Sequence, residues 1–253
     1  MKPVVVRNVA IGEGIPKICV PIVGKTIDEI LNQAKHICEI GADVVEWRVD
    51  WFEEVKNYES VENAAKQLRD ILGETPILFT FRTAKEGGER TIEPDEYVVL
   101  NEKIAKSGYM DLVDVEAFTG DIYVEKVVKT AHECGVKVIA SNHDFQKTPQ
   151  KKELIARMRK MQELGADIPK IAVMPQGKED LLTLLSATEE MTRCYADCPV
   201  ITMSMAGTGV LSRLCGEVFG SALTFGAAGK VSAPGQIDVE ELRTVLGIIH
   251  KSL

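Results

Sequence analysis

The chain has 253 residues, of which 45% are hydrophobic, and a formal net charge of -8 at pH 7. This apolar content can form a substantial core, which excludes a disordered protein. Acidic and basic residues are mixed along the chain without a basic block, so we expect no nucleic-acid partner. No apolar run approaches the ~20 residues that cross a membrane, and the N-terminus has no signal-peptide pattern. The expected location is the cytoplasm.

The six cysteines form no CxxC pair and no cysteine–histidine cluster with the spacing of a zinc site. Most of them lie in apolar strand or helix contexts. We therefore expect free thiols in a reducing compartment, without a metal or a cofactor.

Short apolar runs alternate with helical patterns along the whole chain. Eight runs predict strands, at 18–22, 44–49, 77–81, 112–115, 136–140, 168–173, 200–203 and 222–225. Strands that alternate with helices indicate β-α-β units and a parallel sheet.

Glycines and capping residues mark the ends of the predicted helices. A glycine follows a helical pattern at 41, 73, 108, 135 and 165, where a left-handed residue commonly ends a helix. Thr26 with Glu29 reads as a capping box, Thr148 with Pro149 as an N-cap and a first turn, and Asp238 as the N-cap of the last helix.

Eight parallel strands can close into a barrel or lie in an open, doubly wound sheet. No GxGxxG or Walker loop follows the first strand, so the nucleotide-binding open sheet is disfavoured. We predict an α/β protein with a (β/α)8 TIM barrel, in one domain over residues 1–253. The residues before Lys17 predict a short N-terminal hairpin outside the barrel.

Lys170 is the most informative polar residue, because it lies inside the sixth predicted strand. Alternation places Lys170, Ala172 and Met174 on one face, and Ile171 and Val173 on the face toward the helices. A lysine that points into a barrel is desolvated, which lowers its pKa and frees the amine as a nucleophile. The alternative is a lysine whose ammonium reaches solvent at one end of the barrel.

His143 is the one histidine of four that directly follows a predicted strand, and that strand neighbours the strand of Lys170. Adjacent strands are ~4.8 Å apart, so the imidazole and the amine can share one small substrate, with His143 as general acid and base. Glu86, in a glycine-containing loop, is a candidate to orient His143. The alternative for Glu86 is a solvated loop acid.

Arg213 and the segment 232–236 follow the last two strands, where barrels often bind anions. Arg213 offers a bidentate partner for a carboxylate. The segment combines Pro and Gly with Ser232 and Gln236, a composition that suits a lid over a polyol. A helix-surface arginine and a plain turn are the alternatives.

Several segments together make the chain resemble the type I 3-dehydroquinate dehydratase family, from about Gly12 to the last helix. They are Glu46-Trp47-Arg48-Val49-Asp50, Phe79-Thr80-Phe81-Arg82, Ala84-Lys85-Glu86-Gly87-Gly88, Ser141-Asn142-His143-Asp144-Phe145, Pro169-Lys170-Ile171-Ala172, Met203-Ser204-Met205 and Ser232-Ala233-Pro234-Gly235-Gln236.

The resemblance implies a role for each matching residue. Lys170 would be the Schiff-base lysine and His143 the proton shuttle, with Glu86 as its partner. The substrate-binding set would be Glu46, Arg48, Arg82, Arg213, Ser232 and Gln236, with apolar walls from Met203, Met205 and Phe225. The family is typically dimeric, needs no metal, and dehydrates 3-dehydroquinate in the shikimate route to chorismate and aromatic amino acids.

The chain departs at two places from the pattern expected of relatives. Pro21 stands where a serine is expected, and Ala206-Gly207 where a serine-lysine pair is common.

The residues themselves leave two other functions open. A class I aldolase would use the same lysine to cleave a C–C bond, and a catalytically silent barrel would bind a polyol carboxylate without turnover.

Overall fold

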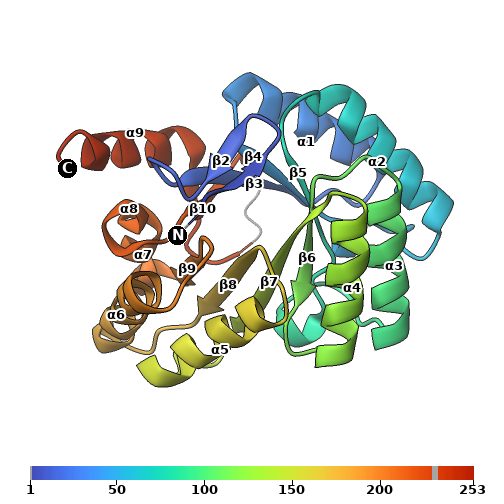
Figure 1. The fold of residues 1–253 in the computed structure, drawn as a ribbon. Helices are drawn as coiled ribbons and strands as arrows, with labels where there is room; N and C mark the ends of the chain where they lie inside the picture. The colour runs from blue at the N-terminus through green and yellow to red at the C-terminus, as the bar shows by residue number, and fades with distance from the viewer. Residues whose placement is uncertain (1, 230–232) are drawn as a thin grey trace.

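The computed structural model describes residues 2–229 and 233–253. Parallel strands curl into a barrel that is surrounded by helices (Figure 1). The barrel strands are β3 (Lys17–Ile22), β4 (Val44–Arg48), β5 (Ile77–Thr80), β6 (Leu112–Glu116), β7 (Lys137–Asp144), β8 (Ile168–Val173), β9 (Ile201–Ser204) and β10 (Leu223–Ala227). Each coincides with one of the eight predicted runs, which confirms the predicted (β/α)8 architecture.

Long helices follow the strands and cover the outer face of the barrel (Figure 1). They are α1 (Ile27–Ile40), α2 (Tyr58–Leu72), α3 (Pro94–Lys106), α4 (Asp121–Glu133), α5 (Lys151–Glu163), α6 (Lys178–Cys194) and α9 (Val239–His250). Short helical turns lie in the loops: η1 (Val49–Trp51), η2 (Ala84–Glu86), η3 (Gly207–Gly209), α7 (Leu211–Leu214) and α8 (Gly216–Phe219). In the described part of the chain, no helix combines the length and the apolar character needed to cross a membrane.

The helix ends follow the sequence signals with two exceptions, at Glu29 and at Thr148. Thr26 and Asp238 cap their helices as predicted, and the five glycines have positive φ. The Glu29 carboxylate accepts from the backbone N–H of Lys25, one residue before the expected donor. The prediction for Thr148 is wrong, because α5 begins at Lys151 after Gln150. The Thr148 hydroxyl instead donates to the carbonyl of Met174 at 3.2 Å.

The barrel closes weakly between its last two strands. One isolated bridge, Val200 with Ser221, joins the residues just before β9 and β10, whereas β7 and β8 pair over six residues. The Ser221 hydroxyl extends the seam, since it accepts from the backbone N–H of Thr202 at 3.0 Å. A two-residue strand, β11 (Ile237–Asp238), also pairs with the end of β10. The last strands are therefore held partly by side-chain hydrogen bonds.

A hairpin closes the end of the barrel where the strands begin. β1 (Val4–Val6) and β2 (Val9–Ile11) pair antiparallel, as expected for a hairpin before Lys17. Its Val4, Val6 and Ile11 join an apolar cluster with the first inward-facing residues of the barrel strands. These residues, which form the barrel floor, are Cys19, Val44, Leu78, Leu112, Ile139, Ile168, Ile201 and Leu223.

One step further along strands β4 to β8 the interior becomes polar, whereas β3, β9 and β10 carry Pro21, Met203 and Phe225 at this level. Because every second residue faces inward, the layer above the floor contains Glu46, Thr80, Asp114, Ser141 and Lys170. All five are buried. The apolar floor thus supports a layer of ionisable groups at the carboxyl ends of the strands, where barrel enzymes carry their chemistry.

Candidate active site

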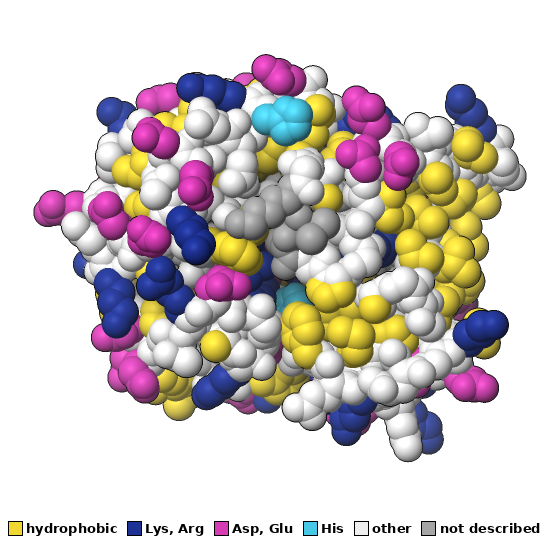
Figure 2. Space-filling model, turned by 180° about the vertical axis from the view of Figure 1, so that it is seen from behind, with side chains coloured by type: hydrophobic (Ala, Val, Ile, Leu, Met, Phe, Trp, Pro, Cys, Tyr) yellow, Lys and Arg dark blue, Asp and Glu magenta, His cyan; other side chains and the backbone are white. Residues whose placement is uncertain are grey.

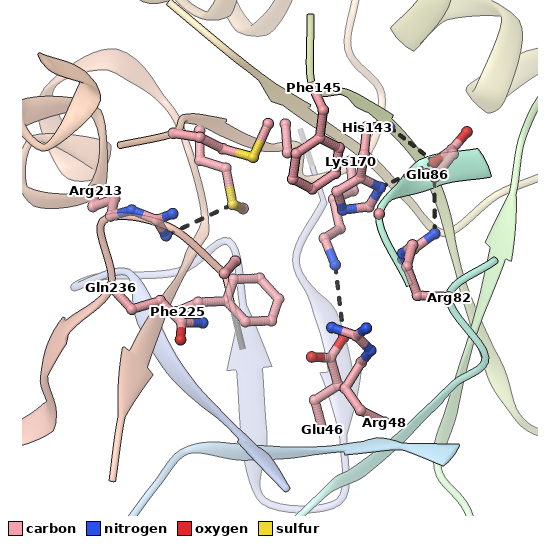
Figure 3. A pocket seen from close by; sticks show the side chains of 15 residues that line it. Glu46, Arg48, Arg82, Glu86, His143, Phe145, Lys170, Arg213, Phe225 and Gln236 are labelled. Carbon is pink, nitrogen blue, oxygen red and sulfur yellow. Dashed lines mark hydrogen bonds and ion pairs between the residues drawn. The ribbon is translucent and has the colours of Figure 1, made fainter. Parts of the chain in front are cut away.

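Lys170 points into the barrel from the middle of β8 (Figure 3). Its side chain is only 4% exposed, while Ile171 and Val173 pack in the cluster that contains the helices. The predicted orientation is therefore confirmed, and the solvent-reaching alternative is wrong. The surroundings of the buried nitrogen are charged, because Nζ lies 3.5 Å from Asp114 Oδ2 and 3.7 Å from Glu46 Oε1. The ring centroid of Phe225 is 4.4 Å from the same nitrogen.

These carboxylates stabilise a positive charge at the lysine nitrogen, as an ammonium or as an iminium. The face of the Phe225 ring adds a weaker attraction of the same sign. The site is thus prepared for a cation at this point of the pocket.

His143 stands at the end of β7, on the strand that pairs with that of Lys170. Its Nδ1 is 3.0 Å from Glu86 Oε2, and its backbone N–H donates to the same oxygen at 2.8 Å. The second oxygen of Glu86 accepts from Asn142 Nδ2 at 3.1 Å. Glu86 is buried, so the alternative of a solvated loop acid is wrong. The structure brings the predicted pair together beside Lys170 (Figure 3).

The glycines after Glu86 allow the loop to pass close to its neighbours. Gly87 has a φ of +83°, and a Cβ there would lie 2.3 Å from the ring of Phe145. A Cβ on Gly88 would lie 1.9 Å from the carbonyl oxygen of Arg82. A side chain at either position would displace the loop and, with it, the Glu86 carboxylate.

Burial perturbs both members of the pair. It raises the pKa of Glu86 to about 7, an effect that the nearby Arg82 reduces. It lowers the pKa of His143 well below its ordinary value, and the positive charges of Arg82, Lys170 and Arg48 add to this shift. The imidazole is therefore neutral at physiological pH, which is the form that accepts a proton.

A second cluster fixes Arg82 below this pair. Its guanidinium donates to Glu116 Oε1 at 3.0 Å, to Asp114 Oδ1 at 2.8 Å and to the Ser141 hydroxyl at 2.9 Å. Burial alone would raise the pKa of Asp114, but Arg82 and Lys170 hold it below its usual range. Both carboxylates are thus counter-charges to the cations of the pocket.

Arg48 is held in the same manner at the end of β4. Its guanidinium makes a bidentate pair with Asp50, at 2.8 and 2.7 Å. The neighbouring Glu46 accepts from the Thr80 hydroxyl at 3.0 Å. These contacts fix two of the predicted binding residues before any ligand arrives.

Arg213 occupies the opposite wall of the pocket (Figure 3). It is 2% exposed, yet no carboxylate within residues 2–229 and 233–253 lies within salt-bridge distance of it. Its guanidinium donates to the Pro234 carbonyl at 3.1 Å and contacts the Met203 sulfur at 3.8 Å, while Nε has no partner among these residues. Burial lowers its pKa to about 10. The alternative of a helix-surface arginine is wrong.

The remaining predicted residues fall as follows. Met203, Met205, Phe225 and Gln236 line the pocket, whereas Ser232 lies outside the described residues. Pro21 is in β3 opposite Glu46, and Ala206 has a φ of +56° where its N–H meets the Pro234 carbonyl. Ala206 therefore contacts the segment that carries Gln236.

Asp50, Asp114 and Asn142 were not predicted as functional residues. For Asp114 a signal was present, since an acid stands inside an apolar strand, two residues from Leu112 and from Glu116. That spacing places all three on the inner face. For Asn142 no signal existed beyond its place next to His143.

The mouth of this parallel barrel holds a buried lysine among carboxylates, beside a histidine–glutamate pair. These features are typical of barrel enzymes that act on carbonyl compounds. The surface around the mouth carries intermixed charges, with apolar side chains gathered toward α7, α8 and α9 (Figure 2).

Comparisons with known proteins narrow this class to a single family. Residues 18–253 match the family model of type I 3-dehydroquinase. The chain is 56% identical to a 3-dehydroquinate dehydratase of Clostridioides difficile, over 100% of this chain and 99% of that protein. A Listeria monocytogenes 3-dehydroquinate dehydratase is 59% identical, over 99% of each chain. The solved structure of the type I enzyme from Clostridium difficile superposes with a TM-score of 0.98, over all of both chains. A Geobacillus kaustophilus 3-dehydroquinate dehydratase, 44% identical, has a TM-score of 0.96 over 99% of this chain and 97% of its own.

The chain belongs to the type I 3-dehydroquinase family. Its activity is the dehydration of 3-dehydroquinate, which makes it a carbon–oxygen hydro-lyase.

Proposed function

We propose that dehydration proceeds through an imine between Lys170 and the ketone of 3-dehydroquinate. The observation that carries this proposal is the inward-facing Lys170 Nζ, buried between Asp114 and Glu46 at 3.5 and 3.7 Å. The neutral amine of Lys170 attacks the carbonyl carbon. The carbonyl oxygen takes one proton from the attacking nitrogen and one from solvent and leaves as water, which yields a cationic iminium that the two carboxylates stabilise. The Clostridium difficile relative, whose solved structure carries covalently modified comenic acid, supports a covalent route.

We propose His143 as the base and acid of the following steps. The iminium acidifies the carbon between the imine and the hydroxyl, and the neutral imidazole removes a proton from it. The resulting enamine expels the hydroxyl, which takes the proton from His143 and leaves as water. A second water hydrolyses the imine, so that 3-dehydroshikimate and free Lys170 are released. Glu86 orients the ring through the 3.0 Å contact with Nδ1.

Arg213 is proposed to bind the substrate carboxylate, because it is a buried cation that lacks a carboxylate partner within the described ranges. The polar side of the pocket is proposed to bind the substrate hydroxyls through Glu46, Arg48, Arg82 and Gln236, with apolar walls from Met203, Met205 and Phe225. Ser232 is assigned to this set from the resemblance alone.

Borohydride reduction in the presence of 3-dehydroquinate tests the imine. The wild-type protein and the Lys178→Ala control, which alters an exposed lysine at the start of α6, should each gain the mass of one reduced adduct. Lys170→Ala should gain none and should lose turnover. Turnover near the wild-type rate in Lys170→Ala would contradict the imine.

The same samples test the two other functions considered above. An aldolase would release a smaller carbonyl fragment from its substrate, whereas dehydration creates a conjugated enone that absorbs in the ultraviolet. A silent barrel would bind the substrate without forming the enone.

We also propose that the enzyme is a cytoplasmic homodimer of the shikimate route to chorismate and aromatic amino acids. The six cysteines are free thiols, which suits a reducing compartment. Leu211, Val218 and Ile248 are more than half exposed on α7, α8 and α9, and large exposed apolar side chains of this kind are common at subunit interfaces. Light scattering should give twice the chain mass, and a monomer over the whole working concentration range would contradict the dimer.

A further inference from the structure

An arginine outside the substrate pocket is linked to the histidine–glutamate pair through the side-chain amide of Asn142. Arg157 of α5 donates from Nη1 to Asn142 Oδ1 at 2.8 Å, and Asn142 Nδ2 donates to Glu86 Oε1 at 3.1 Å. We infer that Arg157 is a positioning residue of the reaction, which acts through the Asn142 amide to hold Glu86 and thereby His143. This inference rests on the proposed roles of His143 and Glu86.

The chemistry of the three groups allows the amide only one orientation. A guanidinium donates hydrogen bonds and cannot accept them, and an ionised carboxylate only accepts. The Asn142 oxygen must therefore face Arg157 and its nitrogen must face Glu86. If the amide were turned by half a rotation, two donors would meet at Arg157 and two acceptors at Glu86. Because Asn142 is buried, water cannot readily compensate for either mismatch.

Contacts from three elements hold Arg157 itself. Its Nη2 pairs with Glu153, one turn earlier on α5. Its guanidinium carbon lies 5.7 Å from the ring centroid of Phe118, in the loop after β6. Asp144 Oδ2, on β7, lies 4.0 Å from Nη1. The side chain is 19% exposed, so it is fixed before substrate binds.

Glu86 divides its two oxygens between these neighbours. Oε2 accepts from the His143 backbone N–H at 2.8 Å and lies 3.0 Å from Nδ1 and 3.6 Å from Arg82 Nη1, while Oε1 accepts from Asn142. Loss of the donor to Oε1 leaves that oxygen without its hydrogen bond, so the carboxylate is held from one side only and the support of the imidazole at Nδ1 is loosened. Arg157 does not line the substrate pocket, so neither substrate binding nor imine formation depends on it directly. The step expected to suffer is proton transfer by His143.

Arg157→Met tests the inference, because methionine retains much of the apolar stem and removes the donors. Arg159→Met is the matched control: Arg159 lies on the same helix, is exposed and stacks 5.1 Å from the ring of Tyr195. In Arg157→Met, kcat should fall about 10-fold, less than the 10²–10⁴-fold of a lost general base, while KM stays within about twofold. Arg157→Lys, which can still donate to Asn142, should recover part of the loss. Arg159→Met should behave as wild type.

Two further measurements separate positioning from a structural role. With 3-dehydroquinate deuterated at the carbon that loses its proton, the isotope effect on kcat should increase in Arg157→Met, since proton transfer becomes slower relative to the other steps. The fraction of enzyme trapped by borohydride as adduct in the steady state should also rise. A wild-type kcat, or a lower kcat with an unchanged isotope effect and adduct fraction, overturns the inference.

If Arg157→Met does not fold, the Asn142→Asp variant tests the inference instead. It keeps an acceptor for Arg157 but places a second carboxylate against Glu86, so the same increase in the isotope effect is expected, and wild-type behaviour overturns the inference. His143→Ala, measured in parallel, separates the two proposals. If it still transfers the proton, the proposed function fails. If proton transfer is impaired in His143→Ala but not in the Arg157 and Asn142 variants, the positioning role alone fails.

Discussion

Two buried arginines of the pocket, Arg82 and Arg213, lie in opposite electrostatic environments. Arg82 is saturated by protein groups, with Asp114 and Glu116 within 3.0 Å of its guanidinium. Arg213 lies against a thioether and one backbone carbonyl. A buried cation without a counter-charge is unfavourable in the unliganded protein and becomes favourable when an anion binds. Arg82 thus fixes the architecture of the site in addition to its proposed contact with the substrate hydroxyls, whereas the charge of Arg213 remains available to the substrate carboxylate.

Arg213→Met should weaken catalysis without weakening the fold. Loss of a bidentate, charge-assisted contact of about 3–4 kcal/mol should lower kcat/KM by roughly 10²–10³-fold, mainly through KM. The free energy of unfolding of the unliganded protein should stay level or increase, since burial already disfavours this charge. Steady-state kinetics and urea unfolding measure the two effects, with Arg193→Met on the surface of α6 as the control. An unchanged KM would assign the substrate carboxylate to another residue.

Glu86→Gln should alter the pH dependence of stability. Glu86 has a pKa of about 7 in the folded protein, above its ordinary value of 4.5. The folded state therefore holds this proton more tightly than the unfolded state, and the free energy of unfolding falls as pH rises between these two values. The neutral glutamine lacks this term. The stability of Glu86→Gln relative to wild type should thus increase from pH 5 to pH 8, by on the order of 2–3 kcal/mol.

Urea unfolding at both pH values measures that difference, and a pH-independent difference would contradict a raised pKa for Glu86. The same variant should show a moderate loss of kcat and a displaced pH profile of kcat, because the support of His143 is changed. Glu89→Gln, in the same loop, is the control for a change of charge alone.

At the scale of the elements, strand order and strand placement were predictable from the sequence, because each strand is a short apolar run that alternates with a helical pattern. Lys170 and His143 followed from that placement. The partners of Lys170 did not, since Asp114 reaches it from a strand 56 residues away and only the closed sheet brings them together. Thr148 shows the limit of local rules: a tertiary contact with the Met174 carbonyl replaced the expected cap.

Ser221→Ala should destabilise the seam between β9 and β10. The serine hydroxyl accepts from the Thr202 N–H at 3.0 Å and lies 3.3 Å from the Thr202 carbonyl. Its removal leaves a buried N–H without its acceptor, which costs about 1–3 kcal/mol. Thermal unfolding should show a lower Tm, and Ser252→Ala near the C-terminus should show none of this loss. An unchanged Tm would mean that the seam does not depend on this hydroxyl.

At the scale of the whole molecule, stability and chemistry lie at opposite ends of the barrel. The hairpin and the apolar floor fill the end where the strands begin, and the ionisable layer lies above them. Substitutions in the floor should therefore change stability and leave the chemical steps intact.

Ile11→Ala tests this separation. Ile11 of the hairpin is fully buried against the floor residues. Its truncation should lower the free energy of unfolding by about 2–4 kcal/mol, through lost burial and the cavity that remains. Well below the Tm of the variant, kcat and KM should equal those of wild type. Val5→Ala, at a 60% exposed position of the same hairpin, should change neither stability nor activity. A reduced kcat in folded Ile11→Ala would show that the floor influences the mouth.

The hairpin also determines how small molecules reach and leave the site. Because it closes the end of the barrel where the strands begin, reactant, product and the released water must all pass through the opening at the carboxyl ends of the strands. The product therefore has to leave before the next reactant enters, and a compound that blocks this opening stops both steps.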